Sequence, residues 1–193
     1  MKNTHYRTGV LFFTLTALCG GAAWAHSGGA VETAVHDHGV HRHDAALGHV
    51  AQASQAMRTV EVTLEDEMRF TPRRIEVVSG ETVRFVVHNK GRLVHEFNIG
   101  SQAEHLQHQQ EMAKMMEAGA LTPTGADADR QQQHNMRHEH ANSVLVEPGQ
   151  SGEFTWTFGA AGDYQFACNV PGHYQAGMVG ELIVSDNGHN HHQ

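Results

Sequence analysis

The segment GDYQFACNVPGHYQAGMVGELIV, residues 162–184, contains two strand patterns joined by an unusual loop. Tyr164, Phe166 and Cys168 alternate along the first part, which predicts a strand with one buried face. The apolar run at residues 178–184 predicts a second strand. The loop between the strands has the spacing C-x4-H-x4-M and is formed by Cys168, His173 and Met178 with a Pro-Gly turn.

The same alternation of apolar and polar residues extends through most of the chain before this segment. TVEVTL (59–64) alternates Val and Leu, and RIEVVSGETVRFVVHN (74–89) contains two such runs around a Ser-Gly turn. LVHEFNIG (93–100) and NSVLVEPGQSGEFTWTF (142–158) supply further strands. About eight short strands predict an all-β fold, a Greek-key β-sandwich or barrel.

A break between the strands, residues 101–142, lacks this period. Its first part, QAEHLQHQQEMAKMMEAG, is rich in helix-forming residues and predicts a helix that ends near Gly119. The remainder has loop composition. We therefore predict a strand domain at residues 58–186 with one helical insertion and a His-rich tail at 187–193.

The N-terminal region indicates export. Lys2 and Arg7 precede an apolar stretch at residues 10–18 and the sequence AWA at 23–25, which predicts a signal peptide cleaved after Ala25 and a periplasmic location. A lipoprotein with Cys19 as the lipidated residue is the disfavoured alternative, because bulky Leu18 precedes that cysteine. Residues 26–57 are rich in His, Ala and Gly and predict a flexible, disordered arm.

Charge and cysteine content limit the partners. The formal net charge of −8 becomes −10 when Lys2 and Arg7 leave with the signal segment, which argues against nucleic acid and anionic lipid as partners. No later run is long enough to insert into a membrane. Cys168 is then the one remaining cysteine, so no intramolecular disulfide can form. We expect a monomer.

The Cys-His-Met loop has the residues that an electron-transfer copper site requires. Such a site uses two imidazoles and one thiolate in a plane, with a weak axial thioether. Cys168, His173 and Met178 supply three of these ligands. For the second imidazole we favour His95, which follows a turn at a strand start, over His88, which ends a strand on the polar face.

Two other interpretations of the loop are less consistent with its residues. A lone buried cysteine is often only a small hydrophobe, but that does not explain the accompanying His and Met. Zinc prefers a tetrahedral site without thioether ligands, so Met178 argues against it.

CNVPGHYQAGMVGELIV, with an upstream His after an NKG turn, resembles the cupredoxins, the blue copper proteins. The resemblance covers roughly residues 59–100 and 143–185. It implies a Greek-key β-barrel and one type 1 copper held by His95, Cys168, His173 and Met178. Many small members have Asn after the first His ligand, whereas this chain has Glu96.

Related enzymes of this fold place histidine beside the cysteine, to pass electrons to a catalytic copper. The neighbours of Cys168 are Ala167 and Asn169, and the length fits one cupredoxin domain. We therefore do not expect an enzyme.

Histidine and methionine are more numerous than one type 1 site needs, because the chain has 18 histidines and 8 methionines. Four of these residues share one face of the predicted helix, at spacings i, i+3, i+7 and i+10: His105, His108, Met112 and Met115. We favour them as copper ligands over simple packing against the core. The arm at residues 26–57 can be interpreted as a copper-chelating segment or as a low-complexity segment without a metal site. If cleavage makes His26 the N-terminal residue, its amine and imidazole could together chelate Cu(II). The candidate secondary copper ligands are His105, His108, Met112, Met115, Met116, His134, Met136, His138, His140, His26, His36, His38, His41 and His43.

These additions resemble the CopI-type branch, the periplasmic copper-tolerance cupredoxins, in the extensions and in the HEF and CNVPGHYQAGM segments. The resemblance implies a function in copper tolerance with a redox-active Cu(I)/Cu(II) site. The alternative is a soluble electron carrier of a respiratory chain, for which extra copper ligands are unnecessary. Copper ions and a redox or copper-transfer protein are the expected partners.

Overall fold

The structure, a computed structural model, describes residues 46–135 and 140–186. The predicted signal peptide, most of the predicted arm and the tail at 187–193 lie outside the described residues. Within the described ranges no helix is long and apolar enough to cross a membrane.

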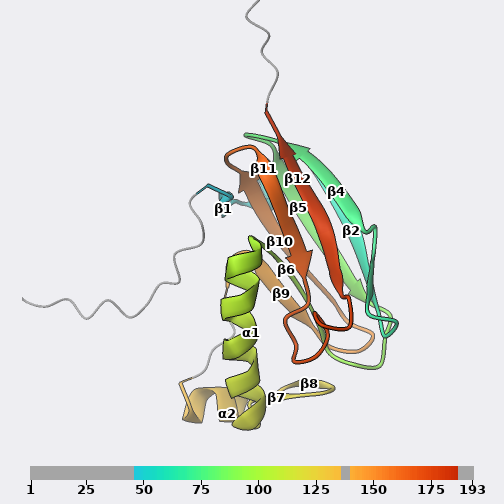
Figure 1. Cartoon of the computed structure of the whole chain (residues 1–193), viewed down its shortest axis with the longest axis vertical. Helices are drawn as coiled ribbons and strands as arrows, with labels where there is room; N and C mark the ends of the chain where they lie inside the picture. Colours follow the sequence, from blue (N-terminus) through green and yellow to red (C-terminus); the bar gives the residue numbers. More distant parts are fainter. Residues whose placement is uncertain (1–45, 136–139, 187–193) are drawn as a thin grey trace, which may run out of the picture. The chain divides into compact units, whose positions relative to one another are not determined.

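Two five-stranded sheets form the body of the domain (Figure 1). The first has the order β1-β10-β5-β2-β3, formed by Gly48–Val50, Ser151–Phe158, Thr82–Asn89, Arg58–Glu65 and Arg69–Thr71. The second has the order β4-β12-β11-β6-β9, formed by Arg74–Val78, Val179–Ser185, Gly162–Ala167, His95–Gly100 and Ser143–Val146. The pairs β2·β5 and β4·β12 are parallel, and the others are antiparallel. The predicted all-β class is confirmed.

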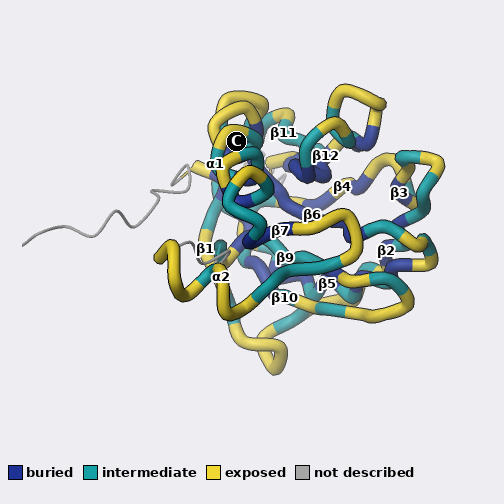
Figure 2. The backbone as a smooth tube through the Cα atoms, turned by 90° about the horizontal axis from the view of Figure 1, so that it is seen from below, coloured by how far each residue is buried: buried dark blue, intermediate teal, exposed yellow. Residues whose placement is uncertain are grey.

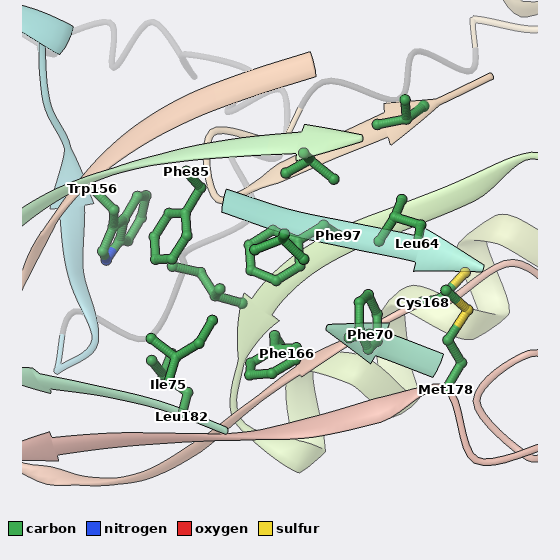
Figure 3. Close-up of a cluster of buried hydrophobic side chains, with 14 of the residues drawn as sticks. Leu64, Phe70, Ile75, Phe85, Phe97, Trp156, Phe166, Cys168, Met178 and Leu182 are labelled. Atoms are coloured by element: carbon green, nitrogen blue, oxygen red, sulfur yellow. The ribbon is translucent and has the colours of Figure 1, made fainter. Parts of the chain in front are cut away.

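The core lies between the sheets and is formed by the apolar positions of the alternating strands. In β5 the buried apolar side chains are Val83, Phe85 and Val87, every second residue. Figure 3 shows Phe85, Phe97 and Phe166 with other aromatic rings in one buried cluster. Ring centroids there lie 5.1 to 6.2 Å apart, in tilted and edge-on arrangements that aromatic pairs prefer.

Part of the predicted arm belongs to the domain, which corrects the boundary at residue 58. Strand β1 pairs with β10, and a short 3-10 helix follows at Ala53–Gln55. The side chain of Leu47 is fully buried, and its carbonyl accepts a hydrogen bond of 3.1 Å from the Trp156 indole. The sequence signal was weak because a three-residue strand is too short to show a period.

The insertion is more structured than predicted. Helix α1, Gln102–Glu117, begins at Ser101, which forms a capping box with Glu104, and is followed by Gly119 at a φ of +70°. The segment predicted as a loop contains the hairpin β7–β8 and the short helix α2; their bounds are Leu121–Thr122, Gly125–Ala126 and Ala128–Gln133. Figure 1 shows α1 beside the second sheet, with α2 and the hairpin near its C-terminal end.

Strand β6 is buried on both faces, unlike the other strands (Figure 2). His95, Phe97 and Ile99 face the core between the sheets. The alternate residues, Glu96 and Asn98, lie on the opposite face, which α1 covers. The insertion therefore buries polar residues that an uncovered sheet would expose.

We predict that Phe85→Ala lowers the free energy of unfolding by about 3–5 kcal/mol, because the deletion leaves a cavity among packed rings. Urea unfolding of the metal-free protein measures the change. Met57→Ala is the matched control, since that side chain is 73% exposed; it should change stability by less than about 0.5 kcal/mol. Equal losses in the two variants would contradict the core assignment.

Candidate metal centre

Two neighbouring strands bring the predicted ligands together at one end of the second sheet. His95 is the first residue of β6, and Cys168 directly follows β11. The two strands pair with Ala167 opposite Asn98, so Cys168 lies beside the beginning of β6. The Glu96 backbone N–H donates a hydrogen bond of 3.3 Å to the Cys168 Sγ.

The loop after Cys168 returns the chain to the same place through backbone hydrogen bonds. The His173 N–H donates to the Val170 carbonyl at 3.0 Å, and the Met178 N–H donates to the His173 carbonyl at 3.0 Å. The Cys168 N–H donates to the Met178 carbonyl at 3.1 Å, which closes the loop. Gly172 adopts a φ of +88°, a conformation that favours glycine.

The donor atoms of His95, Cys168 and His173 all lie within 4.8 Å of one another. The Cys168 Sγ is 3.3 Å from the His173 Nδ1, and the two imidazole centroids are 5.0 Å apart. The Met178 side chain is fully buried, and Figure 3 shows it next to Cys168 at one end of the core. His173 is half-buried, so its ring is the ligand side chain nearest to solvent.

The orientation of His95 fits a metal ligand. Its Nε2 lies 3.1 Å from a carboxylate oxygen of Asp66, while its buried Nδ1 has no hydrogen-bond partner. Asp66 is itself fixed by the backbone N–H groups of Arg92 and Leu93, at 2.8 and 3.2 Å. Metal-ligating histidines commonly donate their other ring N–H to a carboxylate in this way. Two imidazoles, a thiol and a thioether are the donor set that suits copper.

Burial determines the protonation of these groups without a metal. It raises the pKa of the Cys168 thiol to about 12, although the Glu96 N–H partly opposes this change. Burial also lowers the pKa of His95, and it lowers that of His173 to about 4. At neutral pH both imidazoles therefore have a free lone pair, and a bound metal replaces the thiol proton.

Glu96 is the residue at which this chain departs from many small cupredoxins, and its carboxylate is fully buried. It accepts hydrogen bonds from the Asn169 backbone N–H at 3.1 Å and from the Asn169 amide at 2.9 Å. Ser143 Oγ and His108 Nε2 lie 2.6 and 2.8 Å from its other oxygen. The carboxylate thus connects the cysteine loop with β9 and α1.

His88, the rival candidate for the fourth ligand, lies elsewhere. It belongs to β5, and its ring nitrogens lie 2.7 Å from Ser151 Oγ and 2.7 Å from a Glu61 carboxylate oxygen. Its side chain is 40% exposed. The structure therefore groups His95, and not His88, with the cysteine loop.

The candidate secondary ligands are divided among several surroundings. Met112 and Met115 are buried in the hydrophobic core, which is the packing role that we disfavoured from the sequence. Met116 packs on the edge of the core, and His134 is exposed after α2. His105 is buried, with its Nε2 3.4 Å from the Gln165 carbonyl. Outside the described residues lie His26, His36, His38, His41, His43, Met136 and His138.

Two of the candidate secondary ligands lie close together in the structure. His108 on α1 and His140 before β9 have ring centroids 4.4 Å apart. Glu111, which the sequence analysis did not select, lies between them, with a carboxylate oxygen 3.1 Å from His108 Nδ1 and 3.6 Å from His140 Nε2. Its spacing of i, i+3 from His108 was the available signal.

The carboxylates around His108 reverse the effect of burial. Burial alone would lower the pKa of His108, but the charges and hydrogen bonds of Glu96 and Glu111 raise it to about 9. For His105, one turn earlier, burial is the largest effect and lowers the pKa, although the charges of Glu96 and Glu104 act in the opposite direction. The position of His108, between Glu96 and Glu111, therefore favours a positive charge, whereas that of His105 does not.

Comparison with known proteins agrees with this geometry. Residues 56–185 match the family model described as copper binding proteins, plastocyanin/azurin family. The chain is 55% identical over 153 residues to the copper-resistant cuproprotein CopI of Pseudomonas aeruginosa, covering 74% of this chain and 84% of that protein. It is 41% identical over 191 residues to CopI of Rubrivivax gelatinosus, covering 95% and 99% respectively.

The fold also has a solved counterpart. The reduced auracyanin of Roseiflexus castenholzii superposes with a TM-score of 0.51 at 24% identity, covering 67% of this chain and 98% of that protein. This likeness shows a cupredoxin fold.

The pKa of His108 leads to a pH prediction for the metal-free protein in the presence of a chelator. Because its pKa is raised from 6.5 to about 9 on folding, its stabilising contribution is complete below pH 6.5 and is lost as the pH rises to 9. We expect His108→Gln to remove up to about 3 kcal/mol of this pH-dependent stability. Urea unfolding at pH 6.5 and 9 measures the free energy of unfolding of the wild type and the variant. If the variant kept the wild-type difference in this free energy between the two pH values, the assignment would be contradicted.

Proposed function

Because this chain belongs to the plastocyanin/azurin family of copper-binding proteins, we propose that it is a periplasmic type 1 copper protein that protects the cell envelope from excess copper. The observation that supports the copper centre best is the convergence of three buried or half-buried donors on one point, with the buried His95 Nδ1 free of any hydrogen bond.

The ligands are His95, Cys168, His173 and Met178, each with a distinct role. Cys168 would supply the thiolate, His95 and His173 the two imidazoles, and Met178 a weaker thioether donor. When bound, copper supplies one-electron chemistry between Cu(I) and Cu(II). Asp66 holds the His95 ring through its Nε2, so the Nδ1 stays directed at the site.

The polypeptide keeps the ligand positions fixed during a change of redox state. Backbone hydrogen bonds close the loop from Cys168 to Met178, and the Glu96 N–H donates to the thiolate sulfur. A fixed ligand set lowers the rearrangement that accompanies electron transfer. The half-buried His173 would be the ligand that a redox or copper-transfer partner approaches.

Copper tolerance is favoured over simple electron transfer by two observations. Two relatives that share most of their length with this chain bear the name copper-resistant cuproprotein CopI. The chain also has more His and Met residues than one type 1 centre uses. The N-terminal signal pattern supports export, and the absence of histidine beside Cys168 supports a protein without catalytic activity. We further propose that it acts as a monomer.

The type 1 assignment predicts a specific loss of colour. Copper-loaded wild type should show an intense thiolate-to-copper absorption band, and Cys168→Ala should lose it completely, because the thiolate is its origin. His88→Ala is the matched control, as this exposed histidine is remote from the cysteine loop; it should keep the band. A wild type without the band, or a His88→Ala variant without it, would refute the ligand set.

The physiological assignment predicts copper sensitivity. Deleting the gene should lower the copper concentration that arrests growth, and a copy encoding Cys168→Ala should fail to restore full tolerance. Respiratory oxygen consumption without added copper is the discriminating control. Unchanged tolerance together with impaired respiration would instead identify an electron carrier.

A further inference from the structure

A second group of metal-binding side chains lies between α1 and the residue range that precedes β9. We propose that His108, Glu111 and His140 form a second metal site, which takes a divalent cation of the Cu(II) type. The inference rests on the proposed function only for the choice of copper, because the site shares no ligand with the cysteine loop.

The geometry brings three donor atoms to one point. The His108 Nδ1, a Glu111 carboxylate oxygen and the His140 Nε2 lie within 4.8 Å of one another. Glu111 lies in the middle, 3.1 Å from His108 and 3.6 Å from His140. The two rings meet edge to face, with an interplanar angle of 70°. Small side-chain movements suffice to direct all three donors at one ion.

The orientation of His108 is already that of a ligand. Its Nε2 lies 2.8 Å from the fully buried carboxylate of Glu96, so the Nδ1 is the nitrogen that faces Glu111 and His140. A bound ion would displace the proton that this Nδ1 carries at neutral pH. A carboxylate on the second nitrogen fixes the ring and increases its basicity in many metal sites. Glu96 therefore acts as a positioning residue for His108, as Asp66 does for His95.

The three side chains differ in their exposure to solvent. The exposed fraction of the side chain is 8% for His108, 13% for His140 and 26% for Glu111. The inner ligand is thus fixed by packing, while the outer two are partly exposed. This arrangement differs from an exposed acidic cluster, whose side chains have no fixed orientation.

The donor types select the oxidation state. Two imidazoles and a carboxylate suit Cu(II), Zn(II) and Ni(II), and among divalent ions Cu(II) generally binds most tightly. Thioethers favour Cu(I), but the nearby Met112 and Met115 lie in the apolar core. The second site therefore complements the cysteine loop, since it contains no soft ligand.

The site can be tested with site-resolved measurements on the full chain, which separate it from the His-rich arm. In ¹⁵N-labelled protein, Zn(II) chloride should shift the backbone amides of residues 107–112 and 140–142 until they saturate, and Cu(II) sulfate should broaden the same signals. His140→Ala and Glu111→Gln should each lower the Zn(II) affinity at these amides at least about 10-fold. His134→Ala is the matched control and should retain wild-type affinity, because this exposed histidine lies after α2.

Glu96→Gln tests the positioning role, with an expected loss of about 10–100-fold in affinity while all three ligands remain. The proposal would be overturned if the amides of α1 do not move in excess Zn(II), or if they move in His140→Ala and Glu111→Gln with the same affinity as in the wild type. The thiolate-to-copper band of the same variants keeps the two sites distinct. A normal band with silent α1 amides refutes the second site alone, whereas saturable α1 amides without the band refute only the type 1 centre.

Discussion

The hydrogen bonds to the buried carboxylate of Glu96 are the constraint on which the arrangement of both candidate sites depends. Removing a carboxylate from water is costly unless its oxygens are fully paired. Here the cysteine loop, β9 and α1 each direct donors at it, from Asn169, Ser143 and His108. These three segments are far apart in sequence, so satisfying one charge fixes their relative positions. The backbone N–H of the same residue donates to the Cys168 sulfur, which links the network to the proposed copper ligands.

Strand β6 separates two kinds of chemistry by the alternation of its side chains. On the face toward the core, His95 joins Cys168 and Met178 in apolar surroundings. These surroundings keep the imidazole neutral and the thiol protonated until a metal binds. On the other face, Glu96 lies under α1 and favours the protonated form of His108. If this face of the sheet were solvated, water would screen the charge of the Glu96 carboxylate and weaken its effect on His108. Helix α1 of the insertion covers the face.

Each of the two clusters is oriented by a carboxylate outside it. Asp66 fixes His95 from the side remote from the cysteine, and Glu96 fixes His108 from the side remote from Glu111. The rings of His95 and His108 are therefore held by contacts that exist without a metal. Such preorganisation lowers the cost of binding and, for a redox centre, the rearrangement between oxidation states. Copper binding, which family membership establishes, thus has a physical basis in the metal-free fold.

The sequence by itself determined the features that depend on local order. Alternation predicted most strands, and the spacing of Cys168, His173 and Met178 selected the loop, because short loops constrain their own ends. It also favoured His95 from its place at a strand start. Only the tertiary structure decided which face each helical residue meets: Met112 and Met115 pack in the core, whereas His108 meets Glu111 and His140. It also placed Leu47 in the core through the β1–β10 pairing. Contacts between segments distant in sequence leave no period to read, since they depend on how the layers pack.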